Sequence, residues 1–125
     1  CVQGRVLDVI YDCRKGSPTF GKHDLVLLES PEHLVYVPAG CLHGYYALDD
    51  AVVIYGCDQL YDPATDGGVR WDALGIDWPT DAPIISDKDA ALGTLEDWQV
   101  RCAKFFDDTW PMMAQPTPLS LTVKE

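Results

Sequence analysis

One histidine and one tyrosine have the side-chain types and the settings that proton-transfer chemistry requires. His43 lies in segment 38–45, PAGCLHGY, where two glycines allow the backbone to come close to a ligand. Tyr55 ends the most apolar run of the chain, directly before Gly56. A phenol, whose ordinary pKa is about 10, can protonate a carbanion or an enolate. Residue type alone favours structural roles for both, as a hydrogen-bonded histidine and a core aromatic.

Asp89 closes a short motif, Ser86-Asp87-Lys88-Asp89, that precedes the apolar residues Ala90-Ala91-Leu92. A serine followed three residues later by an acidic residue is a capping-box pattern. The pattern predicts that Ser86 and Asp89 begin a turn of helix.

Metal and nucleophile chemistry have little support in the sequence. The three histidines, His23, His33 and His43, are evenly spaced, and no two of them form an HxH or HxxxH pair. A mononuclear site needs about three convergent ligands, so we expect neither a metal nor another cofactor. No GxSxG motif or glycine-rich phosphate loop is present. The five cysteines form no CxxC pair, which favours buried thiols in a reducing cytoplasm over a disulfide framework.

The elements that would position these residues are mostly strands. Four short runs are rich in β-branched and aromatic residues and are separated by turn sequences: Val6–Tyr11, Leu25–Leu28, Leu34–Val37 and Ala51–Tyr55. Such spacing predicts a sandwich or a barrel, and no long helical pattern lies between the runs. Leu95, Trp98, Cys102 and Phe105 then recur at helical spacing and predict one helix. Prolines at 111, 116 and 118 predict an extended tail.

Composition excludes several classes of partner. The chain has 125 residues, about one domain, and 47% of them are hydrophobic, enough for a core. Nine Lys and Arg stand against 20 Asp and Glu, a formal net charge of −11. This charge repels phosphate backbones and anionic lipids, so neither nucleic acid nor a membrane surface is expected as a partner. No apolar stretch reaches the 18–20 residues or so of a membrane span.

Taken together, the segments resemble the dTDP-4-dehydrorhamnose 3,5-epimerase family. The resemblance begins with GRVLDV at 4–9 and DCRKGSPTFG at 12–21, and continues with VPAGCLHGY at 37–45. Tyr55, YDP at 61–63, Trp71, IDWP at 76–79 and ISDKDA at 85–90 extend it, so that it covers roughly residues 2–92. It implies a mainly β, cupin-type jelly roll (a β-sandwich or barrel) over residues 1–92, followed by a short helix and an extended tail over 93–125. It also implies a homodimer that works without a metal on a nucleotide-diphosphate keto-sugar.

The resemblance further implies a role for five residues. Tyr55 matches the acid that reprotonates the sugar, and Asp89 matches the aspartate that orients the catalytic histidine. His43 matches a second histidine that contacts the substrate, and Lys88 a lysine that does the same. Asp66 stands where the family has a glutamate that contacts the nucleotide, and its side chain is one methylene shorter.

The chain departs from the family pattern in one important respect. The family's base histidine, in an R-G-x-H motif, and the neighbouring arginine and lysine lie upstream of every segment matched here. We therefore expect that the base-bearing N-terminal segment is absent from this chain. Three hypotheses remain: an epimerase acting at C3, C5 or both of a dTDP-4-keto-6-deoxyhexose; a non-catalytic, sugar-nucleotide-binding or structural cupin; and a keto-sugar isomerase or single-site epimerase.

Overall fold

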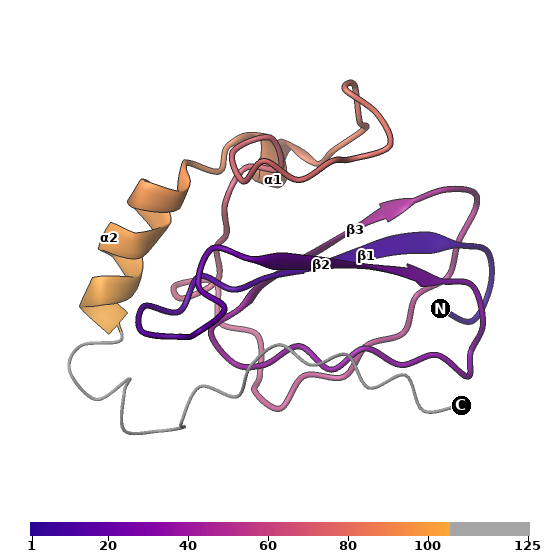
Figure 1. Cartoon of the computed structure of the whole chain (residues 1–125), viewed down its shortest axis with the longest axis horizontal. Helices are drawn as coiled ribbons and strands as arrows, with labels where there is room; N and C mark the ends of the chain where they lie inside the picture. Colours follow the sequence, from indigo (N-terminus) through magenta and orange to yellow (C-terminus); the bar gives the residue numbers. More distant parts are fainter. Residues whose placement is uncertain (106–125) are drawn as a thin grey trace. The chain divides into compact units, whose positions relative to one another are not determined.

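The computed structural model describes residues 1–105, which form two compact units (Figure 1). The first unit, Cys1–Cys57, contains three strands: β1 (Val6–Tyr11), β2 (His23–Leu28) and β3 (Leu42–Ala47). The second unit begins at Asp58 and contains two helices, α1 (Asp87–Ala90) and α2 (Leu95–Phe105). The predicted extended tail lies outside the described residues.

The strands of the first unit form an antiparallel sheet in the order β2-β1-β3. Val6 lies opposite Leu28 on one side and Ala47 on the other, and Tyr11 lies opposite His23 and Leu42. The side chains of Val6, Val9 and Ile10 are buried and form the core of this unit. A central strand with partners on both sides suits the nearly continuous apolar sequence of β1. The predicted strand at 6–11 is confirmed, and the one at 25–28 forms most of β2.

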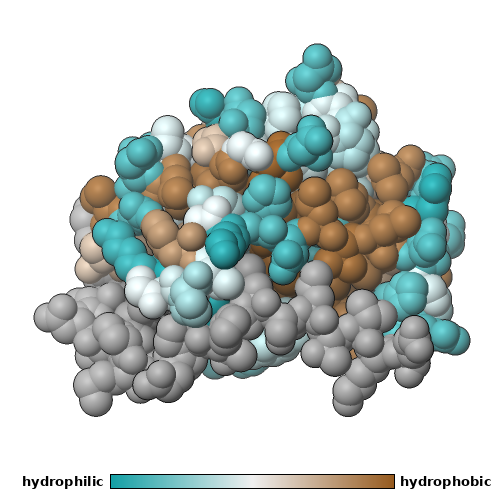
Figure 2. All heavy atoms as spheres, viewed as in Figure 1, coloured by the Kyte–Doolittle hydropathy of each residue, from teal (hydrophilic) through white to brown (hydrophobic). Residues whose placement is uncertain are grey.

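The other two predicted strands are wrong as regular strands. Residues 34–37 have no strand pairing within the described chain, and residues 51–55 contribute only an isolated bridge between Val52 and Gln3. Their alternating apolar side chains remain at the surface: Leu34 is 82% exposed, Tyr36 83% and Ile54 73%. Figure 2 shows hydrophobic residues reaching the surface on the face that it draws. The apolar pattern gives strand propensity, but a strand also needs a neighbour to accept its hydrogen bonds.

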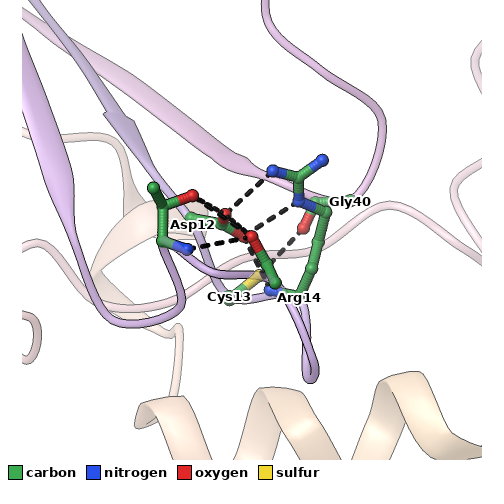
Figure 3. Close-up of polar contacts among 6 residues, drawn as sticks. Asp12, Cys13, Arg14 and Gly40 are labelled. Atoms are coloured by element: carbon green, nitrogen blue, oxygen red, sulfur yellow. Dashed lines mark hydrogen bonds and ion pairs between the residues drawn. The ribbon is translucent and has the colours of Figure 1, made fainter. Parts of the chain in front are cut away.

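The connection between β1 and β2 is built around a buried carboxylate, that of Asp12 (Figure 3). Asp12 accepts hydrogen bonds from Arg14 Nε (2.9 Å) and Nη2 (2.8 Å), from Ser17 Oγ (2.5 Å) and from Thr19 Oγ1 (2.6 Å). Burial by itself would raise the pKa of this carboxyl. The hydrogen bonds from Arg14, Ser17 and Thr19 outweigh burial and hold the pKa well below its usual range. This network folds the ten-residue motif at 12–21 into a fixed loop.

Two cysteines near this network are in contrasting settings. Cys13 Sγ donates a hydrogen bond to the carbonyl oxygen of Gly40 (3.0 Å), which ties the loop to the turn before β3 (Figure 3). Gly40 has a φ of 84°, a left-handed conformation that favours glycine at this position of the turn. Burial raises the pKa of the Cys41 thiol to about 11.

The helices of the second unit begin with side-chain caps. Ser86 Oγ accepts a hydrogen bond from the backbone N–H of Asp89 (3.1 Å), so the predicted helical turn is confirmed as α1. At α2, Thr94 Oγ1 accepts from the Asp97 backbone N–H (3.3 Å), and the Asp97 carboxylate accepts in return from the Thr94 backbone N–H (2.8 Å). The helix predicted from the spacing of Leu95, Trp98, Cys102 and Phe105 is confirmed as α2. No helix within residues 1–105 is long and apolar enough to cross a membrane.

Candidate functional site

His43 lies on β3, and its imidazole is held by a carboxylate from β1. Asp8 and His43 are on adjacent strands, and His43 Nε2 lies 2.8 Å from Asp8 Oδ2. The Asp8 side chain is 5% exposed and that of His43 is 36% exposed, so the pair has a buried anchor and an accessible ring. Since a carboxylate accepts hydrogen bonds, it fixes the proton on Nε2 and leaves Nδ1 to meet a ligand. This geometry suits a histidine that contacts a substrate.

Asp8 is a site residue that the sequence analysis missed. It is quoted there only as part of the motif at 4–9, yet it is a single charge inside the apolar run of β1, and that position was a usable signal. The other oxygen, Oδ1, is buried and accepts no hydrogen bond from the residues that the structure describes. A buried carboxylate in a central strand is costly unless it has a partner, and here His43 is that partner.

We expect Asp8→Asn to change the proton position on His43. The amide can donate as well as accept, so the imidazole loses the acceptor that selects the Nε2–H form. Nitrogen-15 NMR of the imidazole should show one dominant tautomer in the wild type and a mixture in Asp8→Asn. Asp50→Asn, in the exposed loop after β3, is the matched control and should leave the ring signals unchanged. An unaltered tautomer in Asp8→Asn would show that the carboxylate does not orient His43.

Tyr55 lies beyond β3, near the end of the first unit, and is 75% exposed. Its hydroxyl group makes no hydrogen bond within residues 1–105, so the phenol is accessible as a proton donor. The sequence analysis expected this residue to end a strand over residues 51–55. The structure instead places it on a segment without strand pairing, at the surface of the first unit.

Two further predicted residues, Asp66 and Lys88, meet in the second unit. The Lys88 ammonium donates a hydrogen bond to Asp66 Oδ2 and also lies 5.8 Å from the centroid of the Tyr61 ring. The hydrogen bond from Lys88 lowers the pKa of the Asp66 carboxyl, and the same bond raises the pKa of Lys88. Both groups are accessible to solvent, so the pair presents a cation and an anion side by side to a ligand.

Asp89, the fifth predicted residue, is one residue from Lys88 and points into its own helix cap. Ser86 Oγ donates to Asp89 Oδ2 at 2.8 Å. No histidine is bound to this carboxylate among the described residues. The structure therefore unites His43 with Asp8 in one unit and Asp66 with Lys88 in the other.

Metal binding has no visible basis in this part of the protein. Across residues 1–105, no group of three or more His, Cys, Asp or Glu side chains could hold a metal ion. His23 instead stacks on Tyr11 across the β1–β2 pair, with ring centroids 6.4 Å apart and an angle of 10° between the planes. This histidine has a packing role in the sheet.

Comparison with known proteins places these features in a family. The model of the dTDP-4-dehydrorhamnose 3,5-epimerase family matches residues 1–97. The enzyme of that name from Mycobacterium tuberculosis strain H37Rv is 43% identical over 104 residues, which cover 78% of this chain and 52% of the enzyme. A dTDP-4-dehydrorhamnose 3-epimerase from Streptomyces niveus is 43% identical over 98 residues, or 74% of this chain and 47% of the relative.

A solved structure has a similar fold. A 3'-monoepimerase from Streptomyces bikiniensis, in complex with dTDP-quinovose, superposes with a TM-score of 0.70 and 37% identity. The match covers 80% of this chain and 53% of that one. The antiparallel sheet and this likeness define a mainly β protein of the cupin-type jelly-roll class. Within that class, the chain belongs to the dTDP-4-dehydrorhamnose 3,5-epimerase family. It spans about half the length of the curated relatives that it matches.

Proposed function

We propose that this protein is a nucleotide-sugar epimerase that inverts C3, C5 or both of a dTDP-4-keto-6-deoxyhexose. The observation that carries the proposal is the family match over residues 1–97, because that stretch contains all five candidate site residues. The relative from Streptomyces bikiniensis, which holds dTDP-quinovose, supports a dTDP-linked sugar as the ligand. The Asp66–Lys88 pair offers a cation for the diphosphate and an anion for the nucleotide's donors.

The chemistry follows from the ketone at C4 of such a sugar. The carbonyl group acidifies the C–H bonds at C3 and C5, so a base removes one proton and an enolate forms. An acid on the opposite face then donates a proton to the same carbon, and the centre is inverted. Tyr55 acts as that acid, since its phenol is exposed and makes no hydrogen bond within residues 1–105. His43, held by Asp8, contacts the sugar.

In this proposal, the base that removes the proton lies in a part of the protein outside this chain. No described histidine is bound to Asp89, whose carboxylate is occupied by Ser86. Asp89 orients that base when both are present, which requires a rotation of its carboxylate away from the helix cap. In the family motifs, the base histidine lies upstream of every segment matched here, and this position supports a base outside the chain.

Solvent deuterium uptake tests the proposal. A dTDP-4-keto-6-deoxyhexose is incubated in D₂O with this chain and, separately, with its full natural gene product, and the sugar protons are followed by NMR. We expect uptake at C3, C5 or both with the full product. Uptake at C3 alone would identify a single-site epimerase, a candidate favoured by the two matched relatives that are named as 3-epimerases.

The second candidate function is a sugar-nucleotide-binding cupin without catalysis. Within residues 1–105 the Asp89 carboxylate is bound by Ser86 and by no histidine, as this alternative also requires. Saturable dTDP-sugar binding by the full gene product without deuterium uptake would establish it and overturn the epimerase proposal.

We further propose that the protein acts as a cytoplasmic homodimer. No disulfide joins its cysteines within the described residues, which suits a reducing compartment. The exposed apolar side chains of Leu34, Tyr36 and Ile54 are the kind of surface that a second subunit covers. Analytical ultracentrifugation of the full gene product distinguishes a dimer from a monomer.

A further inference from the structure

An arginine on α2 holds the backbone of the turn that carries Asp66. Arg101 Nη2 donates hydrogen bonds to the carbonyl oxygens of Ala64 (3.0 Å) and Asp66 (2.8 Å). One guanidinium nitrogen therefore bridges two carbonyls at the end of the same turn. The planar guanidinium group has a fixed donor geometry, so it constrains the direction of these carbonyls more than a lysine would.

The contact between α2 and this turn is close as well as polar. A Cβ atom placed on Gly67 would lie 2.8 Å from Arg101 Nη1 and 2.9 Å from Cζ3 of Trp98. Trp98 and Arg101 are three residues apart and thus share one face of α2. A side chain at Gly67 would force Arg101 or Trp98 to move, so α2 packs directly on the backbone after Asp66.

The turn at residues 62–66 is also held at its start, by Asp62. Asp62 Oδ1 accepts from the Ala64 backbone N–H (2.9 Å), and the Asp62 carbonyl accepts from the Asp66 N–H (2.9 Å). Arg101 holds the last residues of the turn, where the chain continues to Gly67. The Asp66 carboxylate that meets Lys88 therefore projects from a backbone fixed on both sides.

We propose that Arg101, with Trp98 beside it, is a positioning residue for the Asp66–Lys88 pair and thereby sets the affinity for the nucleotide part of the ligand. Arg101 lies beyond the stretch matched by the family model, so the chain uses a residue outside that stretch to arrange a pair inside it. The inference rests on the proposed function in one respect: that Asp66 and Lys88 contact a dTDP-linked ligand. Arg101 acts through the backbone of residues 64–66 and does not itself need to touch that ligand.

The first arm of the test uses no ligand. Carbon-13 NMR follows the titration of the Asp66 carboxyl in the wild type, Arg101→Ala, Arg101→Lys and Arg70→Ala. Arg70 is the matched control, because it is an exposed arginine of the same unit that pairs with Asp72. We expect the Asp66 pKa to move toward an ordinary aspartate value in Arg101→Ala, to move less in Arg101→Lys and to stay unchanged in Arg70→Ala. Circular dichroism melts show that each variant is folded.

The second arm measures dTDP binding by isothermal titration calorimetry. We expect Arg101→Ala to weaken binding roughly tenfold, about the effect of losing the alignment of one hydrogen bond to a charged group. Arg101→Lys should recover part of the loss, and Arg70→Ala should stay within about twofold of the wild type. In the Asp66→Asn background, Arg101→Ala should add no further loss, since the two residues act through one contact.

The outcomes separate this inference from the proposed function. An unchanged Asp66 titration and unchanged dTDP affinity in Arg101→Ala would overturn the positioning role and leave the epimerase proposal intact. Additive losses in the double variant would also overturn it, because they would mean that Arg101 acts independently of Asp66. If the wild type does not bind dTDP, the assigned ligand is wrong, and the Asp66 titration alone decides whether Arg101 positions the pair.

Discussion

Replacing Asp12 by alanine is expected to lower the free energy of unfolding by about 3–5 kcal/mol, the usual cost of breaking a buried ion pair from one side. The carboxylate is fully buried, and its removal leaves the guanidinium of Arg14 and the hydroxyls of Ser17 and Thr19 without their common acceptor. A small domain has about 5–15 kcal/mol of stability in total, so much of it would be lost. Urea denaturation followed by tryptophan fluorescence measures the difference.

Asp49→Ala is the matched control for this prediction. Asp49 also pairs with an arginine, Arg5, at 2.8 Å in the same unit, but both side chains are largely exposed. Solvent screens such a pair, so its loss should have a much smaller effect. Equal destabilisation by Asp12→Ala and Asp49→Ala would contradict the view that the buried network stabilises the first unit.

Lowering the pH should remove the contribution of Asp12 to the free energy of unfolding. Its pKa is depressed in the folded protein, so the unfolded chain binds the proton more readily. The stabilisation is complete above the unfolded pKa of about 3.9 and is lost as the pH falls below that value toward the folded pKa. The stability difference between the wild type and Asp12→Ala should therefore be constant between pH 7 and about pH 5 and should shrink below about pH 4.

Tyr55→Phe should lower the turnover of the full gene product by about 10²–10⁴-fold, the usual contribution of a general acid. Only the hydroxyl group is removed, and this group makes no hydrogen bond within residues 1–105. Stability and dTDP affinity should therefore stay close to those of the wild type. Deuterium uptake and product formation by NMR give the rate, and calorimetry gives the affinity.

Tyr36→Phe provides the comparison for that variant. Tyr36 is also an exposed tyrosine of the first unit, on a segment without strand pairing, and the proposal assigns no chemistry to it. Its variant should keep the wild-type rate. If Tyr55→Phe turned over as fast as Tyr36→Phe, another group would have to be the acid.

Local patterns in the sequence predicted the elements that depend on local physics. The bounds of β1 and α2 follow from an apolar run and from helical spacing, and the start of α1 follows from the Ser86 cap. β3 was not predicted, because His43 and Gly44 interrupt its pattern; it forms because β1 offers an open edge. Conversely, residues 34–37 have strand propensity but no neighbour to pair with in the described chain.

In the candidate site too, local sequence could be used to predict some features, whereas others depend on tertiary structure. The resemblance to the family implied that His43 and Lys88 contact a ligand, but their partners within the chain depend on tertiary structure. Asp8 is 35 residues from His43, and Asp66 is 22 residues from Lys88, so no short motif could pair them. The role of Arg101 could not be predicted from the sequence for a further reason. Its contacts are to backbone carbonyls, which every residue has.

Two cysteines of the first unit, Cys41 and Cys57, have a practical consequence for following the protein in solution. At neutral pH, a thiol with a pKa of about 11 is almost entirely protonated, so Cys41 is a poor nucleophile toward maleimides. Cys57 is exposed and lies two residues after Tyr55. The native sequence therefore already holds an attachment point for a fluorophore or a spin label beside the candidate acid. Ligand arrival at that end of the unit can be watched without adding a new cysteine.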